Sequence, residues 1–182
     1  MTIYKNSGLV LSMQSAIAAA KTITIATNAA PGVFTSVAHG YLDGDIILMR
    51  IQGMIEVNER VFVVVNKATD TFQLRNNATG AIGIDTTLFG IFSSGTAEKV
   101  TLGTTIPGVQ EFSPTGGDIE FLDTTTVSDT RKTQIVSGVS AQSYGMTLQW
   151  DPGDTAQSAM QAAFETNSTR SFRITWPGGR YM

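Results

Sequence analysis

The 182-residue sequence contains no cysteine and a single histidine, His39. The absence of cysteine excludes disulfide frameworks, thiolate metal sites and cysteine nucleophiles. A single histidine excludes a multi-histidine metal centre and leaves little acid–base chemistry near neutral pH. We therefore expect no metal or other cofactor, and the composition argues against an enzyme.

Charge is also scarce. Only 15% of the residues are charged and the net charge is −3, against a charged share of about 25% in an ordinary domain. So low a charged share argues against a disordered acidic or basic tail. The small negative net charge excludes a general electrostatic attraction to nucleic acid.

Long apolar runs are missing as well. Runs such as residues 46–49 and 61–65 have four or five apolar residues, whereas a membrane-spanning helix needs about 18. The N-terminal segment loosely imitates a signal peptide, but Ser12, Gln14 and Ser15 interrupt its apolar stretch. We expect a soluble chain with no membrane partner and an intact N-terminus.

Threonine and glycine are abundant instead, with 25 and 18 residues, and both favour strands and tight turns over helices. Between residues 22 and 99, short β-branched and apolar runs alternate with turn signals such as Asp43-Gly44. Residues 46–51 and 60–66 are apolar on both faces, which indicates interior strands. The even spacing of these strands predicts a small barrel or sandwich.

Residues 100–182 show a similar pattern with one exception. Alternating residues predict strands at 118–122, 144–150 and 171–176. In the second strand Tyr144, Met146, Leu148 and Trp150 should share a face, and in the third Phe172, Ile174 and Trp176. Between these two strands, apolar residues recur at helical spacing, which predicts an amphipathic helix capped by Asp154 or Thr155. We expect a mainly β fold with one packed α-helix. The side chains expected in its core are Trp150, Ala156, Ala159, Met160, Ala163, Phe164 and Trp176.

His39 is followed by two carboxylates, Asp43 and Asp45. A histidine and a carboxylate can form an acid–base pair, and Asp-Gly-Asp resembles a fragment of a calcium loop. No serine elbow, phosphate loop or complete calcium motif accompanies them. We interpret His39 as structural, with its ring hydrogen-bonded to a loop backbone, and residues 43–45 as a turn.

The densest acidic cluster is formed by Asp118, Glu120 and Asp123, which we place at alternating positions of one strand. Carboxylates so arranged fit a glycosidase cleft, the solvated face of a strand, or the wall of a channel. The polar segment 123–137 overlaps the end of this strand, and so long a loop is uncommon unless it has a function. We interpret this segment as an interaction arm.

The end of the sequence contains the hairpin turn Trp176-Pro177-Gly178-Gly179, followed by only three residues. A return strand of this length cannot complete a hairpin by itself. The pattern predicts either a truncated product or pairing supplied by another subunit.

Residues 33–74 resemble a small β-module that is inserted in many phage structural proteins and is named for the first catalytic cysteine half-domain of ubiquitin-activating enzymes. The shared landmarks are His39-Gly40, Gly44-Asp45, the turn from Gly53-Met54 to Val57-Asn58, and the closing residues 70–74. The module carries no catalytic residue.

Residues 118–178 resemble the major tail tube proteins of long-tailed, siphovirus-type phages. The features that carry this resemblance are the acidic-apolar strand running into Asp123, the loop to Gly138, the Trp150-Asp151-Pro152 strand end, the helix begun by Asp154 and the strand at 172–176. No single one of these features identifies the family, but their occurrence together in this order is specific for it.

The resemblance implies a structural protein with a tail-tube-type β-sandwich or barrel at residues 1–21 and 100–182. The small β-barrel module, residues 22–99, would be inserted on the outer surface. Copies would form hexameric rings, stacked into a tube around a tape-measure protein and joined to tail terminator and tail tip proteins. DNA would pass through the channel without sequence specificity. The protein would be part of the virion tail, after assembly in the host cytoplasm.

The resemblance also implies roles for the acidic cluster and the polar arm. Asp118, Glu120 and Asp123 are candidates for the lumen wall, where modest negative charge repels phosphates. Contacts between subunits or rings are expected in residues 1–20 and in the 123–137 arm. The candidates in this arm are Thr125, Asp129, Arg131, Lys132 and Gln134.

Two functions of other classes stay open at this point. The first is a carbohydrate-binding or host-surface adhesion module that uses tryptophan or tyrosine platforms. The second is a hydrolase that uses Asp118 or Glu120 together with His39.

Overall fold

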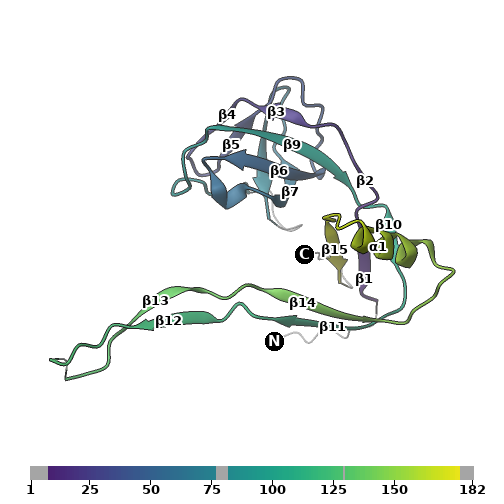
Figure 1. Cartoon of the computed structure of the whole chain (residues 1–182). Helices are drawn as coiled ribbons and strands as arrows, with labels where there is room; N and C mark the ends of the chain where they lie inside the picture. The colour runs from purple at the N-terminus through teal and green to yellow at the C-terminus, as the bar shows by residue number, and fades with distance from the viewer. Residues whose placement is uncertain (1–7, 77–81, 129, 177–182) are drawn as a thin grey trace. The chain divides into compact units, whose positions relative to one another are not determined.

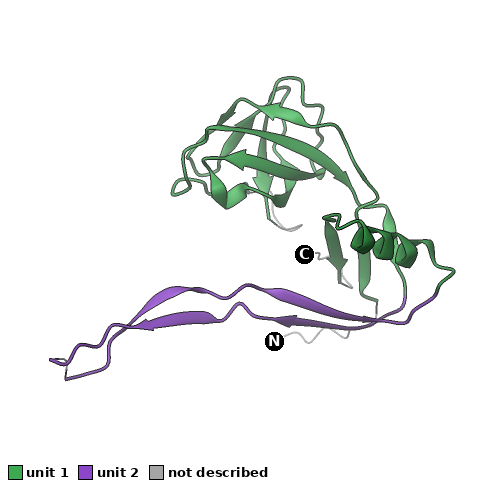
Figure 2. Ribbon diagram, viewed as in Figure 1, with its two compact units in different colours: residues 1–107, 152–182 green, residues 108–151 purple. Residues whose placement is uncertain are grey.

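The computed structural model describes residues 8–76, 82–128 and 130–176. The chain divides into unit 1, residues 1–107 and 152–182, and unit 2, residues 108–151 (Figure 2). Unit 1 contains a small barrel and a three-stranded sheet with one α-helix, and unit 2 is a two-stranded ribbon (Figure 1). The predicted mainly β fold with a single α-helix is confirmed.

An eight-stranded sheet between residues 16 and 101 forms the barrel. The strand over residues 21–26 breaks at Thr24, so that β3 pairs with β9 while β4 pairs with β5. The sheet closes on itself because β6, β7 and β8 connect β9 back to β5, and closure pairs the strand edges within the barrel. Its elements are β2 (Ala16–Ile17), β3 (Lys21–Ile23), β4 (Ile25–Ala26), β5 (Val33–Thr35), β6 (Ile46–Gln52), the 3₁₀ turn η1 (Ile55–Val57), β7 (Arg60–Val65), β8 (Thr71–Arg75) and β9 (Ser94–Thr101).

The barrel core is built from residues that alternate along the strands. In β6, Ile47, Met49 and Ile51 are buried, and the residues between them point outward. Phe34 and Phe72 are completely buried, with ring centroids 5.9 Å apart. β6 lies between β7 and β9, and β7 between β6 and β8, so both are interior strands as predicted.

The predicted turn at residues 43–45 is confirmed. Gly44 has a φ of 93°, which glycine adopts without the strain that a side chain would cause. Oδ2 of Asp45 accepts a hydrogen bond from the Leu42 backbone N–H at 3.0 Å, and its Oδ1 lies 2.7 Å from Nζ of Lys99. Oδ1 of Asp43 accepts from the Lys67 backbone N–H at 2.9 Å. These contacts give both carboxylates structural roles.

The second part of unit 1 is a sheet in which β1 (Val10–Met13) lies between β10 (Thr104–Ile106) and β15 (Phe172–Thr175). The helix α1 (Thr155–Glu165) contacts β10. It begins where expected, because Oδ1 of Asp154 accepts hydrogen bonds from the backbone N–H groups of Ala156 and Gln157 at 3.0 and 2.9 Å. The predicted helix packed on a sheet is therefore confirmed.

The predicted core face of α1 is wrong in part. Ala156 and Ala163 are buried and Met160 is half-buried, but Ala159 is exposed and Phe164 is 87% exposed. The buried position missed by the pattern is Gln157, whose Nε2 donates to the Pro107 carbonyl at 3.3 Å. The packing on β10 therefore buries only part of the predicted apolar stripe of α1. The sequence defines the stripe, but it does not define how much of the stripe the sheet covers.

The strand at the C-terminal end of the described residues also departs from the pattern. Phe172 and Ile174 share a face of β15, as predicted, but only Ile174 is buried. Trp176 is half-buried and so only partly meets the core prediction. The predicted Pro177-Gly178-Gly179 turn lies outside the described residues. No helix in the described part of the chain is long and apolar enough to cross a membrane.

Candidate assembly site

Unit 2 is a ribbon made of two consecutive antiparallel strand pairs. β11 (Val109–Thr115) pairs with β14 (Ser143–Leu148), and we name this pair the proximal half. β12 (Ile119–Asp123) pairs with β13 (Gln134–Val139), and we name this pair the distal half. Gly116 and Gly117, both at a φ of 80°, connect β11 to β12. A Cβ at position 116 would overlap the carbonyl oxygen of Ala141, so the connection between β11 and β12 requires glycine there.

The ribbon confirms two predicted strands and adds two others. The strands predicted at 118–122 and 144–150 correspond to β12 and β14. β11 was not predicted, because Pro114 argues against a strand. β13 occupies the end of the segment 123–137, which was predicted to be a long loop, and this prediction is wrong for residues 134–137. The adjacent β-branched residues Ile135 and Val136 were the available signal.

The proximal half has two unlike faces. Phe112 lies opposite Met146 and Pro114 opposite Tyr144, and paired residues of antiparallel strands point to the same side. The rings of Phe112 and Tyr144 stack with centroids 5.4 Å apart. The other side is rich in hydroxyl groups, and Oγ1 of Thr115 lies 2.7 Å from Oγ of Ser143. Its members are Glu111, Ser113, Thr115, Ser143, Gly145 and Thr147.

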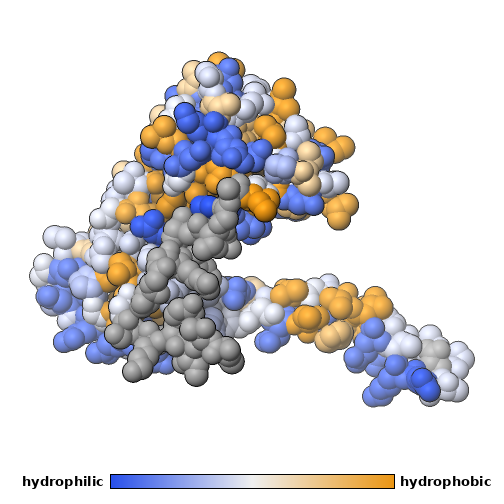
Figure 3. All heavy atoms as spheres, turned by 180° about the vertical axis from the view of Figure 1, so that it is seen from behind, coloured by the Kyte–Doolittle hydropathy of each residue, from blue (hydrophilic) through white to orange (hydrophobic). Residues whose placement is uncertain are grey.

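The distal half is apolar on both faces. Phe121 pairs with Val136 on one face, and Leu122 pairs with Ile135 on the other. Phe121 is 59% exposed and Leu122 is 55% exposed. Figure 3 shows hydrophobic side chains gathered along the ribbon next to a hydrophilic tip. Large apolar side chains exposed in this way mark a protein interaction surface.

Each of the four ribbon strands has one strand partner among the described residues. β11 pairs only with β14 there, and β12 only with β13. Every strand therefore keeps one edge that can pair with a strand of another molecule. A two-stranded ribbon without a covering layer is marginally stable in water. The ribbon thus has both the free edges and the apolar faces of an unfinished sheet.

The predicted acidic cluster does not occupy a single strand face. Asp118 precedes β12, and Glu120 shares the face that carries Leu122. Asp123 lies three positions after Glu120, and side chains alternate along a strand. It therefore points to the opposite face, which also carries Phe121. The prediction of alternating positions is therefore wrong for Asp123. The proposed place of these carboxylates on a lumen wall stays a prediction.

The candidate contact residues lie at the far end of the distal half. Hydrogen bonds from the Thr125 side chain, and then from its backbone N–H, lower the pKa of Asp123. Oγ1 of Thr125 also accepts from the Thr133 backbone N–H at 3.1 Å, which closes the base of the loop. Gln134 pairs with Asp123 in the ladder, and Arg131 and Lys132 are exposed. Asp129 lies outside the described residues.

His39 has the structural role that the sequence predicts. Its side chain is 3% exposed inside the barrel, and its Nδ1 accepts a hydrogen bond from the Tyr41 backbone N–H at 2.9 Å. The ring stacks on Tyr41 and contacts the edge of Phe72. A histidine buried in this way cannot act on an external substrate, so the hydrolase interpretation loses its acid–base group.

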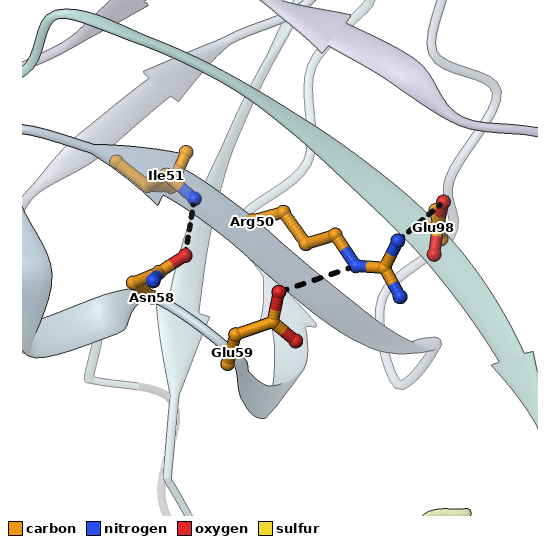
Figure 4. Close-up of polar contacts among 5 residues, drawn as sticks. All are labelled: Arg50, Ile51, Asn58, Glu59 and Glu98. Carbon is orange, nitrogen blue, oxygen red and sulfur yellow. Dashed lines mark hydrogen bonds and ion pairs between the residues drawn. The ribbon is translucent and has the colours of Figure 1, made fainter. Parts of the chain in front are cut away.

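An open groove of about 550 Å³ lies on the outside of the barrel, beside β6 and β9. Arg50 on its wall is held by two carboxylates, with Nε 3.5 Å from Glu59 and Nη1 3.8 Å from Glu98 (Figure 4). Oδ1 of Asn58 accepts from the Ile51 backbone N–H at 2.9 Å. Of the described residues that line the groove, none is aromatic, so it lacks a platform for stacking on sugars.

Trp150 is the other candidate for such a platform, and its predicted core position is wrong. It follows the end of β14 and is 54% exposed. The alternation of Tyr144, Met146 and Leu148 predicted their shared face correctly. It could not predict that this face lacks a cover within unit 2, because covering depends on residues distant in the sequence.

Comparison with known proteins identifies the family of the chain. A search of curated proteins finds no match. The family model described as phage tail tube protein, TTP, matches residues 52–182. This range covers well over half of the chain and includes the whole ribbon, the helix α1 and the strand β15. The chain therefore belongs to the phage tail tube protein family, as a structural component of the virion tail and not an enzyme.

Proposed function

We propose that copies of this chain join through the ribbon into hexameric rings, and that the rings stack into the tail tube of a long-tailed, siphovirus-type phage. The tube encloses the channel through which DNA passes during ejection. The observation that carries this proposal is the ribbon, whose distal half has apolar side chains on both faces that no other part of unit 2 covers. Membership of the tail tube family supports the same conclusion.

The free edges of the ribbon support a ring. The unpaired edges of β11 and β14 lie on opposite sides of the proximal half, because these two strands are each other's partners. The edge of β11 in one copy can therefore pair with the edge of β14 in the next. A head-to-tail contact of this kind closes into a ring when the rotation between copies matches, and a ring of strands leaves no free edge.

The barrel suits a different position in this assembly. Its sheet closes on itself and its core is buried within one chain. Under the proposal, residues 22–99 form an inserted module, related to that of ubiquitin-activating enzymes, on the outer surface of the tube. Residues 1–21 and 100–182 form the tail-tube domain. A bulky module on the outside leaves the channel open.

The remaining expectations follow from the same proposal. The tube holds a tape-measure protein before ejection, is joined to tail terminator and tail tip proteins, and is assembled in the host cytoplasm. Asp118, Glu120 and Asp123 are candidates for the lumen wall, and the loop with Thr125, Asp129, Arg131, Lys132 and Gln134 for contacts between subunits or rings. A wall with modest negative charge lets DNA slide, because it repels phosphates.

The proposal is tested by negative-stain electron microscopy and sedimentation of the purified full chain. We expect rings or tubes from the wild type. Leu122→Asp places a charge on an apolar face of the ribbon, and we expect it to sediment as dissociated subunits. Leu88→Asp is the matched control, because Leu88 is an exposed leucine in the barrel unit, and we expect normal assembly. Wild-type protein that stays monomeric at every concentration, or a Leu122→Asp variant that assembles normally, would contradict the proposal.

A further inference from the structure

The two halves of the ribbon differ in how many faces need a cover. In the proximal half, apolar side chains occupy one face only, and the other carries hydroxyl groups, a glycine and one carboxylate. In the distal half, Phe121 and Val136 occupy one face, and Leu122 and Ile135 the other. A sheet with one polar face can stay wet on that side, whereas a sheet with two apolar faces is stable only between two layers.

Backbone pairing alone does not complete the distal half. Adding a strand to an edge satisfies N–H and C=O groups, but it leaves the side chains on both faces in water. Ile119 and Val139 extend the apolar surface of the Phe121 face, and both are exposed. The distal half therefore needs contacts above and below the sheet in addition to contacts at its edges.

We infer that, in the assembled tube, the distal half is buried on both faces between layers contributed by other copies of this chain. The proximal half is covered on its apolar face alone, and its hydroxyl-rich face, which includes Ser113 and Thr147, stays in water along the channel. This inference rests on the proposed tube and adds which face of which strands is buried.

The occupant of both distal faces is a second copy for two reasons. The chain belongs to a family of tube-forming proteins, so identical copies surround each subunit. Each copy carries the same apolar distal half, so the copies that surround a subunit can supply the apolar layers that its two faces need.

The inference also concerns the acidic cluster. Glu120 shares a face with Leu122 and Ile135, so placing it on the lumen wall would also expose two large apolar side chains to the water of the channel. The inference therefore moves the lumen wall from the acidic cluster to the proximal half. The hydroxyl-rich proximal face has no such conflict. It is nearly uncharged, with Glu111 as its one ionisable residue, and this gives the channel a wall to which DNA phosphates do not bind tightly.

The chain has no cysteine, so single-cysteine variants of the full-length protein report on one position at a time. The variants are Phe121→Cys and Val136→Cys for one distal face, Leu122→Cys and Ile135→Cys for the other, and Ser113→Cys and Thr147→Cys for the hydroxyl-rich face. Thr69→Cys, at an exposed turn of the barrel, is the labelling control. Each variant reacts with a small water-soluble thiol reagent as dissociated subunit and as assembled tube, after sedimentation confirms each state.

We expect the reaction at both distal faces to slow at least about 100-fold on assembly, because labelling then requires local opening. At Ser113→Cys and Thr147→Cys we expect rates within about threefold of those in the dissociated subunit, because an accessible thiol keeps its reactivity. Two positions on each face keep the test valid if one variant fails to assemble.

Three results would overturn the inference. The first is one distal face that reacts as fast in the tube as in the subunit. The second is a hydroxyl-rich face that becomes protected. The third is protection of the distal faces that already exists in dissociated subunits, since the cover then comes from the same chain. Failure of the wild type to form tubes is a separate outcome, and it overturns the proposed function.

Discussion

The barrel, residues 16–101, and the ribbon, residues 108–151, are both built from short antiparallel strands, but only the barrel supplies its own cover. In the barrel the sheet closes and buries Phe34, Phe72 and their neighbours completely. In the ribbon the apolar residues of β12 and β13 are exposed, and each strand has a single strand partner within the described part of the chain. Similar local patterns thus lead to a finished module in one region and an assembly surface in the other.

This difference shows where the stability of each region originates. The barrel can be tested in a single subunit, because its hydrophobic contacts are made within the chain. The stability of the ribbon depends on the concentration of other copies, because their binding stabilises the folded state by mass action. Changes in the barrel should therefore alter unfolding, and changes in the ribbon should alter assembly.

The largest expected effect comes from a matched pair of phenylalanine substitutions. Phe34→Ala removes a completely buried ring from the barrel and should lower the free energy of unfolding by about 3–5 kcal/mol. Phe121→Ala removes an exposed ring from the ribbon and should change it by less than about 0.5 kcal/mol while weakening assembly. Urea denaturation of dissociated subunits and sedimentation measure the two effects. Equal losses of stability would remove the distinction between the regions.

The barrel should also lose stability at alkaline pH through Tyr41. Burial, and then the charges of Glu98 and Asp45, raise the pKa of Tyr41 to about 12. Its hydroxyl donates to the Ala97 carbonyl at 2.8 Å, so folding favours the neutral form. In the unfolded chain the Tyr41 hydroxyl ionises near pH 10. Its contribution to the free energy of unfolding is therefore complete below pH 10 and is lost as the pH rises toward 12.

The expected slope is at most about 1.4 kcal/mol per pH unit between pH 10 and 12. Tyr41→Phe cannot ionise and should flatten this part of the profile, at the cost of about 1 kcal/mol from the lost hydrogen bond. Urea denaturation at several pH values gives the measurement. If both proteins show the same slope, Tyr41 does not cause the alkaline loss.

The helix cap in unit 1 should give a smaller effect. Asp154→Ala removes the acceptor for two backbone N–H groups of α1 and should cost about 0.5–2 kcal/mol. Asp154→Asn keeps an acceptor oxygen and should recover most of this loss. Thermal unfolding followed by circular dichroism measures both variants. An Asn variant as unstable as the Ala variant would show that the charge, rather than the capping hydrogen bonds, is responsible.

The smallest effect is expected at the ion pairs of Arg50. Its side chain is half-exposed and its distances to Glu59 and Glu98 are long, so Arg50→Met should change the free energy of unfolding by less than about 1 kcal/mol. Assembly should be unaffected, since the groove belongs to the barrel. Urea denaturation at low and high salt gives the measurement. A loss comparable to that of Phe34→Ala would show that the barrel depends on its surface charges.

Much of the barrel could be predicted from the sequence, because its signals are local. Asp43-Gly44 predicts its turn through the conformational freedom of glycine, and the apolar runs of β6 and β7 predict interior strands. His39 could be interpreted as structural because no catalytic motif accompanies it. In each case a few adjacent residues carry the physical constraint.

The sequence-based predictions are wrong where the burial of a side chain depends on which other part of the protein covers it. Trp150 and Phe164 are apolar and correctly spaced, so the pattern predicted core positions, yet both are exposed. The pattern missed Gln157, which is buried against the carbonyl of Pro107, a residue distant in sequence. Hydrophobic periodicity identifies the face that needs a cover, and it contains no information about whether the same chain provides one.

The sequence by itself determined the mainly β class, the turns, the start of the helix and the two unlike faces of β14, because backbone preference and alternation act over a few residues. Only the tertiary structure decided that β13 pairs with β12 and that the ribbon lacks a cover within unit 2. Strand register and burial depend on contacts between residues far apart in the chain, and local sequence patterns do not encode those contacts.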